Sequence, residues 1–279
     1  IWLVMKYGLK TSILSLLGAF LLMVVSGGSV PSVFLILLQY GLLGVVIGLL
    51  FKNHLSGRNV IIATLSTASV FALIVLVVTL LAAGGGGWLI DSDIQGALEQ
   101  VMAFYKEAGL IQDTNSAQAE AVLEDMVRVS KLLFPSSIVL MSMGWALLTL
   151  IVARVILRRF KFDVPALPPF RDWSLSWVSI WGLIVGLGFS LLGDEMSWAF
   201  VSMVGKNLLL VFVVIYLLLG ISFATFLFKK YNISKFLKII IVVIAVFYWP
   251  VALILFFTFG VLDTLLNLRD RIRKKEAQN

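Results

Sequence analysis

The chain has 279 residues, of which 61% are hydrophobic and only 13% are charged, and its mean hydropathy is +1.05. A composition this apolar excludes a soluble globular protein and predicts an integral membrane protein with several crossings of about 20 residues each. The chain has no cysteine and one histidine, so neither a metal site nor a redox cofactor is expected. Its net charge of +7 fits the collection of Lys and Arg in cytoplasmic loops, and nucleic acid is not an expected partner.

Residues 1–90 form the expected N-terminal membrane region. The chain starts with Ile1 rather than Met, inside an apolar segment, so we expect the natural N-terminus to lie upstream. Apolar runs at 11–25 and 31–51 predict two crossings joined by a tight turn, and a third crossing is predicted over 60–83.

Residues 91–132 differ in composition from the flanking membrane runs. The segment 91–131 carries eight acidic and three basic residues. Its apolar residues recur at helical spacing, which predicts an amphipathic helical hairpin outside the cytoplasm. We interpret it as a small cap on the membrane domain or at the lipid interface rather than as a catalytic or receptor domain.

Residues 133–268 form the expected C-terminal membrane region. Crossings are predicted over 134–156, 173–192 and 196–228. The last apolar run, 236–266, is either one kinked crossing or a hairpin that turns at Tyr248–Pro250, and the hairpin is preferred. The hairpin places the basic tail 269–279 in the cytoplasm, on the same side as the basic joint at 154–171.

No motif of a known enzyme class is present. The sequence contains no HExxH, GxSxG or GxxxxGK[ST] pattern and no carboxylate pair inside an apolar run, so we do not expect an enzyme. Asp263, near the end of the last apolar run, is expected to pair with Arg269 or to face water.

Small and neutral polar residues are the other candidates. Gln39, Asn207 and Tyr216 could line a polar cavity for a small neutral or weakly charged solute. The serines and threonines in the same helices can instead bond to backbone carbonyls of their own helix. A closed polar cavity at Gln39, Asn207 or Tyr216 favours a transport role, and close apolar packing there favours a structural role. Two sets of glycines are spaced for close helix packing: Gly41, Gly44 and Gly48, and Gly182 and Gly186.

Several motifs resemble known families. Residues 130–270 resemble the uncharacterised YybS-like bacterial membrane proteins through Phe134-Pro135, the basic string Arg154–Arg159 and the stretch from Pro165 to Trp173. The residues that carry this resemblance most clearly are Pro168, Pro169, Arg171, Trp173, Asn207, Asp263 and Arg269. The resemblance implies no established activity.

The N-terminal third is similar to the substrate-binding subunits of energy-coupling-factor vitamin transporters. Tyr7-Gly8 before a helix and the stretch Gly41–Gly48 that leads to Lys52 carry this similarity. It implies cytoplasmic termini, about ten segments in the full protein and an ATPase module as a partner. The acidic insertion and the additional C-terminal helices depart from that pattern, and they leave docking of an ATPase in doubt.

The sequence therefore predicts an all-α, polytopic helical membrane protein of the bacterial cytoplasmic (inner) membrane, with phospholipid as its surroundings and a cytoplasmic C-terminus. The first functional hypothesis is a transport-related solute-binding subunit that an ATPase or another membrane protein energises. The alternative is a non-transporting scaffold that binds anionic lipid or partner proteins.

Overall fold

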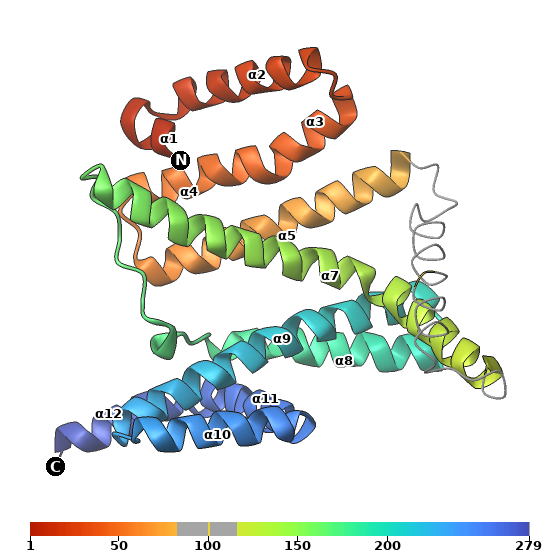
Figure 1. Ribbon diagram of the computed structural model, residues 1–279, viewed down its shortest axis with the longest axis vertical. Coiled ribbons are helices and arrows are strands. Elements are labelled where there is room, and N and C mark those ends of the chain that lie inside the picture. Colours follow the sequence, from red (N-terminus) through yellow and green to blue (C-terminus); the bar gives the residue numbers. More distant parts are fainter. Residues whose placement is uncertain (83–99, 101–115, 279) are drawn as a thin grey trace. The chain divides into compact units, whose positions relative to one another are not determined.

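A computed structural model describes residues 1–82, 100 and 116–278 (Figure 1). Its regular elements, over those residues, are helices, which confirms the all-α class. Six of these helices are long and apolar enough to cross a membrane: Val30–Lys52, Gly57–Leu81, Asp125–Arg159, Trp177–Glu195, Ala199–Lys230 and Trp249–Leu266. The chain divides into two compact units, unit 1 (Ile1–Leu55 and Val60–Val164) and unit 2 (Ser56–Asn59 and Pro165–Asn279).

Unit 1 contains the N-terminal helices and one very long helix. Its elements are α1 (Trp2–Tyr7), α2 (Leu9–Val25), α3 (Val30–Ile36), the π-helical turn η1 (Leu37–Gly41), α4 (Leu42–Lys52), most of α5 (Gly57–Ala82) and α7 (Ser116–Arg159). The 17 residues of α2 span about 26 Å, slightly less than the ~30 Å hydrocarbon core. Ser29 caps α3 by accepting a hydrogen bond from the Ser32 main-chain N–H. This cap stabilises the start of α3 directly after the turn from α2.

The glycines of the N-terminal region lie where helices approach one another. A Cβ on Gly48 would lie 2.7 Å from the Val4 Cβ, and one on Gly44 would lie 3.7 Å from Ile1 Cγ1. A Cβ on Gly41 would lie 2.9 Å from Leu16 Cδ2. The small residues thus seat α1 and α2 against the chain from η1 to α4.

The helix α7 runs without a break through the boundary predicted at 132–133. It has 44 residues and carries Pro135 inside it. The first predicted helix of the acidic insertion lies outside the described residues. The second predicted helix, from Ser116 on, is continuous with the predicted crossing at 134–156.

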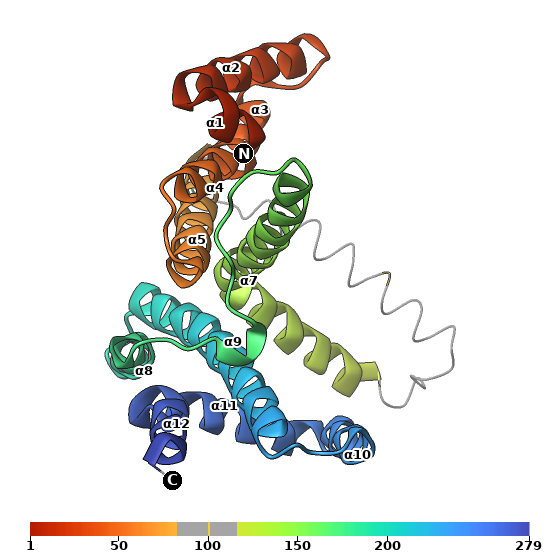
Figure 2. The same cartoon turned by 90° about the vertical axis from the view of Figure 1, so that its left-hand side faces the viewer.

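Unit 2 is organised around α9 (Ala199–Lys230), which packs against both α8 (Ile180–Glu195) and α11 (Trp249–Leu266). Figure 2 shows the same three helices from the side. The remaining elements are the short turns η3 (Phe170–Asp172) and η4 (Trp177–Ser179) and the helices α10 (Lys235–Phe247) and α12 (Leu268–Gln278). The run predicted as a crossing over 196–228 corresponds to α9, which begins at Ala199.

Glycines also lie at the contacts that α9 makes with α8 and with α11. On α8, Gly182 faces the Phe212 ring, and a Cβ on Gly186 would lie 3.1 Å from Leu209 Cγ. At the crossing of α9 and α11, a Cβ on Gly220 would overlap the Phe256 carbonyl, and one on Gly260 would overlap the Tyr216 carbonyl. These backbones therefore touch directly, which only glycine permits.

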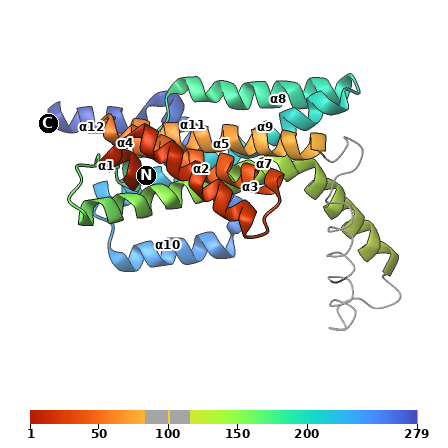
Figure 3. The same cartoon turned by 90° about the horizontal axis from the view of Figure 1, so that it is seen from above.

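The last apolar run is a hairpin. α10 ends at Phe247 and α11 begins at Trp249, and Figures 1 and 3 show that α11 runs back in the opposite direction. Of the two alternatives that the sequence left open, the structure adopts the turn at Tyr248–Pro250. With 13 residues, α10 spans about 20 Å, less than the hydrocarbon core.

We expect Gly260→Ala to lower the free energy of unfolding by about 1–3 kcal/mol, because the added methyl group forces α9 and α11 apart. Gly188→Ala is the matched control, since no neighbouring atom lies within 4 Å of the new Cβ. It should be neutral or stabilise by up to about 1 kcal/mol through helix propensity. Thermal unfolding of both variants in detergent tests this, and equal melting temperatures would contradict the close crossing.

Candidate functional site: the Arg269 cluster

A backbone turn after α11 directs one arginine into the protein. Asn267 ends α11 in the left-handed conformation, with φ 48° and ψ 49°. Asparagine tolerates this conformation better than most residues do. α12 begins at Leu268, and the chain places Arg269 against the last turns of α11.

Arg269 and Asp263 form a buried ion pair. The Arg269 Nε lies 2.9 Å from Asp263 Oδ2, and the two side chains are 6% and 4% exposed. The main-chain N–H of Arg269 also donates to Asp263 Oδ1, at 3.3 Å. The pairing expected from the sequence is therefore present, and both side chains are largely buried.

The rest of the guanidinium binds main-chain and hydroxyl oxygens from other elements. Nη1 donates to the Arg171 carbonyl at 2.6 Å, and Nη2 contacts Ser222 Oγ at 3.1 Å and the Leu219 carbonyl at 3.4 Å. The Ser222 hydroxyl in turn donates to the Phe170 carbonyl at 2.6 Å. One side chain thus joins η3, α9, α11 and α12.

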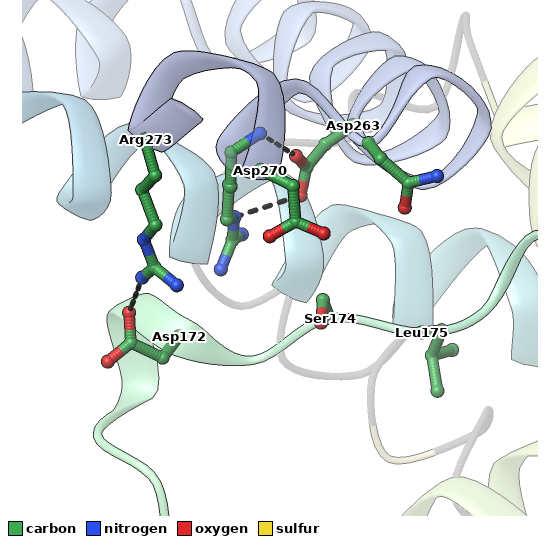
Figure 4. Close-up of a pocket in the computed structure, with 8 residues that line it drawn as sticks. Asp172, Ser174, Leu175, Asp263, Asp270 and Arg273 are labelled. Atoms are coloured by element: carbon green, nitrogen blue, oxygen red, sulfur yellow. Dashed lines mark hydrogen bonds and ion pairs between the residues drawn. The ribbon is translucent and has the colours of Figure 1, made fainter. Parts of the chain in front are cut away.

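Aromatic rings and a second ion pair surround this centre. The Arg269 guanidinium lies 5.6 Å from the centroid of the Phe223 ring and 5.8 Å from that of Phe226, within cation–π range. Arg273 Nη2 lies 2.6 Å from Asp172 Oδ1 (Figure 4). We call Arg171, Asp172, Ser222, Asp263, Arg269 and Arg273 the Arg269 cluster.

Burial and the neighbouring carboxylates act in opposite directions on the charge of Arg269. Burial lowers the pKa of the Arg269 guanidinium, while the carboxylates of Asp263 and Asp172 favour its protonated form. A buried charge is costly unless it is paired and hydrogen-bonded. Arg269 meets both conditions.

A small cavity lies beside the cluster, between the chain at 172–175 and the start of α12 (Figure 4). Its volume is about 50 Å³, enough for water but far below the ~300 Å³ or more of a typical small-molecule site. Among the described residues, no group of three or more His, Asp or Glu side chains could hold a metal ion. The cavity is therefore too small for a typical metabolite.

Most of the motif residues named from the sequence lie at or beside this cluster. Trp173 donates its Nε1–H to the Pro168 carbonyl at 3.2 Å and packs edge-on against Phe170. Pro169 precedes η3 in an extended conformation. Asn207 lies elsewhere, in α9, where it donates to the Met203 carbonyl at 2.8 Å.

The other proposed ligand residues also bond within the protein. Gln39 Nε2 lies 3.3 Å from Ser142 Oγ, which donates to the Ala68 carbonyl at 3.1 Å. The Tyr216 hydroxyl is 2.7 Å from Ser179 Oγ, and Tyr216 is completely buried. Gln39, Asn207 and Tyr216 do not line the cavity beside the cluster.

Sequence reasoning missed Ser222, Asp172 and Arg273. Ser222 is one of three hydroxyl-bearing residues on the buried face of α9, with Ser202 and Tyr216. Its position in an apolar run was the available signal, because a hydroxyl buried in an apolar helix face needs a partner.

Comparisons with known proteins place the chain among membrane proteins. A family model described as "Predicted membrane protein (DUF2232)" matches residues 1–264. The chain is also 26% identical over 243 residues to "Uncharacterized protein YybS" of Bacillus subtilis (strain 168), an alignment that covers 82% of this chain and 73% of that protein. No solved structure matches the chain significantly. The YybS-like resemblance is confirmed, whereas similarity to energy-coupling-factor subunits stays a prediction.

We expect Arg269→Met to destabilise unit 2 by about 3–5 kcal/mol, because it leaves the Asp263 carboxylate buried without its partner. Adding Asp263→Asn should recover part of that loss. Arg273→Gln is the control, since its ion pair is partly exposed and should contribute about 1 kcal/mol or less. A double-mutant cycle on detergent-solubilised protein measures the coupling, and additive losses for Arg269 and Asp263 would contradict the pairing.

Proposed function

The chain belongs to the DUF2232 family of predicted membrane proteins, and from that premise we propose that it acts as a membrane-embedded, non-enzymatic scaffold. Its role in this proposal is to hold a basic surface in a fixed geometry at the cytoplasmic face of a bacterial inner membrane. The observation that carries the proposal is the Arg269 cluster.

The cluster fixes the element that bears this basic surface. α12 carries Arg271, Arg273 and Lys274, and Arg269 ties its first turn to α9, α11 and η3. Figures 1 and 3 place the start of α10, with Lys235, at the same end of unit 2 as α12. Concentration of Lys and Arg at one end is typical of the cytoplasmic side.

Rigid placement favours a protein partner with an acidic surface. Charge complementarity across an interface gives specificity when the charges are held in register. A buried arginine that is paired with a carboxylate is one way to hold them, since the pair cannot shift without leaving a charge unpaired. Binding to an anionic lipid surface does not require the basic residues to be held in fixed positions.

The second candidate, a solute-binding transport subunit, is favoured by one observation in unit 1. Gln39 lies in the π-helical turn η1, inside the membrane run Val30–Lys52. Such turns occur frequently at functional sites. Against this, the amides of Gln39 and Asn207 and the hydroxyl of Tyr216 bond within the protein.

The test is gentle purification of the full-length protein from its own host, with mass spectrometry of the proteins and small molecules that accompany it. The scaffold proposal predicts a protein partner that is released by salt, because screened surface charges carry the contact. Arg271→Glu with Lys274→Glu should reduce its recovery severalfold. Lys10→Glu with Arg58→Glu, an equal charge change in another part of the chain, should not.

A stoichiometric ATPase or a single retained metabolite would contradict the scaffold and support the transport subunit. Gln39→Leu sharpens this distinction. For a scaffold it should cost about 0.5–1.5 kcal/mol of stability through the lost bond to Ser142 and leave the accompanying molecules unchanged. For a solute-binding subunit it should abolish retention of the metabolite.

A further inference from the structure

A second cavity, in unit 1, has a different chemistry from the Arg269 cluster. It is an apolar groove of about 420 Å³ between α1 and the C-terminal half of α7. Its walls include Ile1 and Trp2 on one side and Trp145, Val152 and Ile156 on the other. Its volume falls within the ~300–1,000 Å³ range of ligand sites, and its walls suit a hydrocarbon chain.

The groove has a defined cause in the packing of unit 1. Gly44 and Gly48 hold α1 close to α4. On α7, the wall residues Trp145, Val152 and Ile156 recur at spacings of a single helix face. Leu157, which also lines the groove, and the neighbouring Leu150 are almost fully buried. The groove therefore lies between α1 and α7.

Three basic residues, Lys6, Lys52 and Arg159, lie on or at the ends of the helices that form this groove or adjoin it. The Lys6 ammonium lies 4.9 Å from the centroid of the Trp2 ring, which lines the wall. A Cβ on Gly8, directly after α1, would lie 3.7 Å from the Lys52 ammonium. Arg159 follows Ile156 by three positions, so it extends the same face of α7 beyond the apolar wall.

We propose that this groove binds one anionic phospholipid. An acyl chain lies along the apolar wall, and the phosphate of the headgroup lies at Lys6, Lys52 and Arg159. Basic pockets beside membrane helices bind anionic headgroups in this way on the cytoplasmic side. Charge complementarity at the end of the groove distinguishes this site from ordinary lipid contact along an apolar helix. The site is separate from the Arg269 cluster and does not depend on the proposed scaffold function.

Native mass spectrometry of the full-length protein in detergent tests the proposal, with phosphatidylglycerol and phosphatidylcholine of identical acyl chains as probes. The protein should bind its first phosphatidylglycerol about tenfold or more tightly than phosphatidylcholine, given the contribution of each basic residue near a headgroup. The triple variant Lys6→Gln, Lys52→Gln, Arg159→Gln should lose that preference. Lys229→Gln, Lys235→Gln, Lys238→Gln, with the same loss of charge, should retain it.

A second pair of variants tests the groove itself. Val152 and Val155 are both exposed on α7, at 46% and 52%, but only Val152 lines the groove. Val152→Trp should fill the groove and weaken binding of the first phosphatidylglycerol severalfold, while Val155→Trp should not. Equal affinity of the unaltered protein for both lipids, or equal effects of the two tryptophans, would overturn the proposal. A groove filled by another segment of the protein would give that same outcome.

Discussion

A guanidinium withdrawn from water must find a carboxylate and enough oxygens for its donors, and unit 2 is built to satisfy this requirement. Arg269 pairs with Asp263 and donates to carbonyls of Arg171 and Leu219. Because these partners come from different elements, the single charge determines where the chain at 165–175 and the start of α12 lie. The energetic penalty of breaking the pair is what makes that arrangement specific.

Helix packing supplies the frame in which this pair can form. In a bilayer, little free energy is gained when an apolar side chain moves from lipid into a helix interface. Helix association therefore relies on close contact between backbones. Gly220 and Gly260 allow α9 and α11 to touch at their carbonyls. The contact brings Leu219 and Ser222 to the side of α11 that carries Asp263. Small residues and one buried ion pair thus act together.

The sequence predicted the helical class and most of the membrane runs, because hydropathy over about 20 residues is a strong local signal. It also predicted the turn at Tyr248–Pro250, where aromatic and proline residues interrupt the last run. It did not predict the continuity of α7, since Pro135 and the change in composition there both resemble a boundary. The tolerance of this proline inside the helix is a property of the surroundings rather than of the local sequence.

The candidate site was predictable only in part. Asp263 and Arg269 are neighbours in sequence, and their pairing follows from local spacing. Ser222 and Arg171 stand 47 and 98 positions from Arg269, so no local pattern links them. Likewise, nothing in the residues around Gln39 distinguishes the π-helical turn from an ordinary α-helix.

Cross-linking in intact membranes tests the central claim that Arg269 holds the chain at 165–175 against α12. Because the chain has no native cysteine, Ser174→Cys with Asp270→Cys gives a clean pair, and both positions line the cavity beside the cluster. A short bifunctional thiol reagent should join the two cysteines, and addition of Arg269→Met should abolish the product. Absence of the cross-link, or its full persistence without Arg269, would contradict the account.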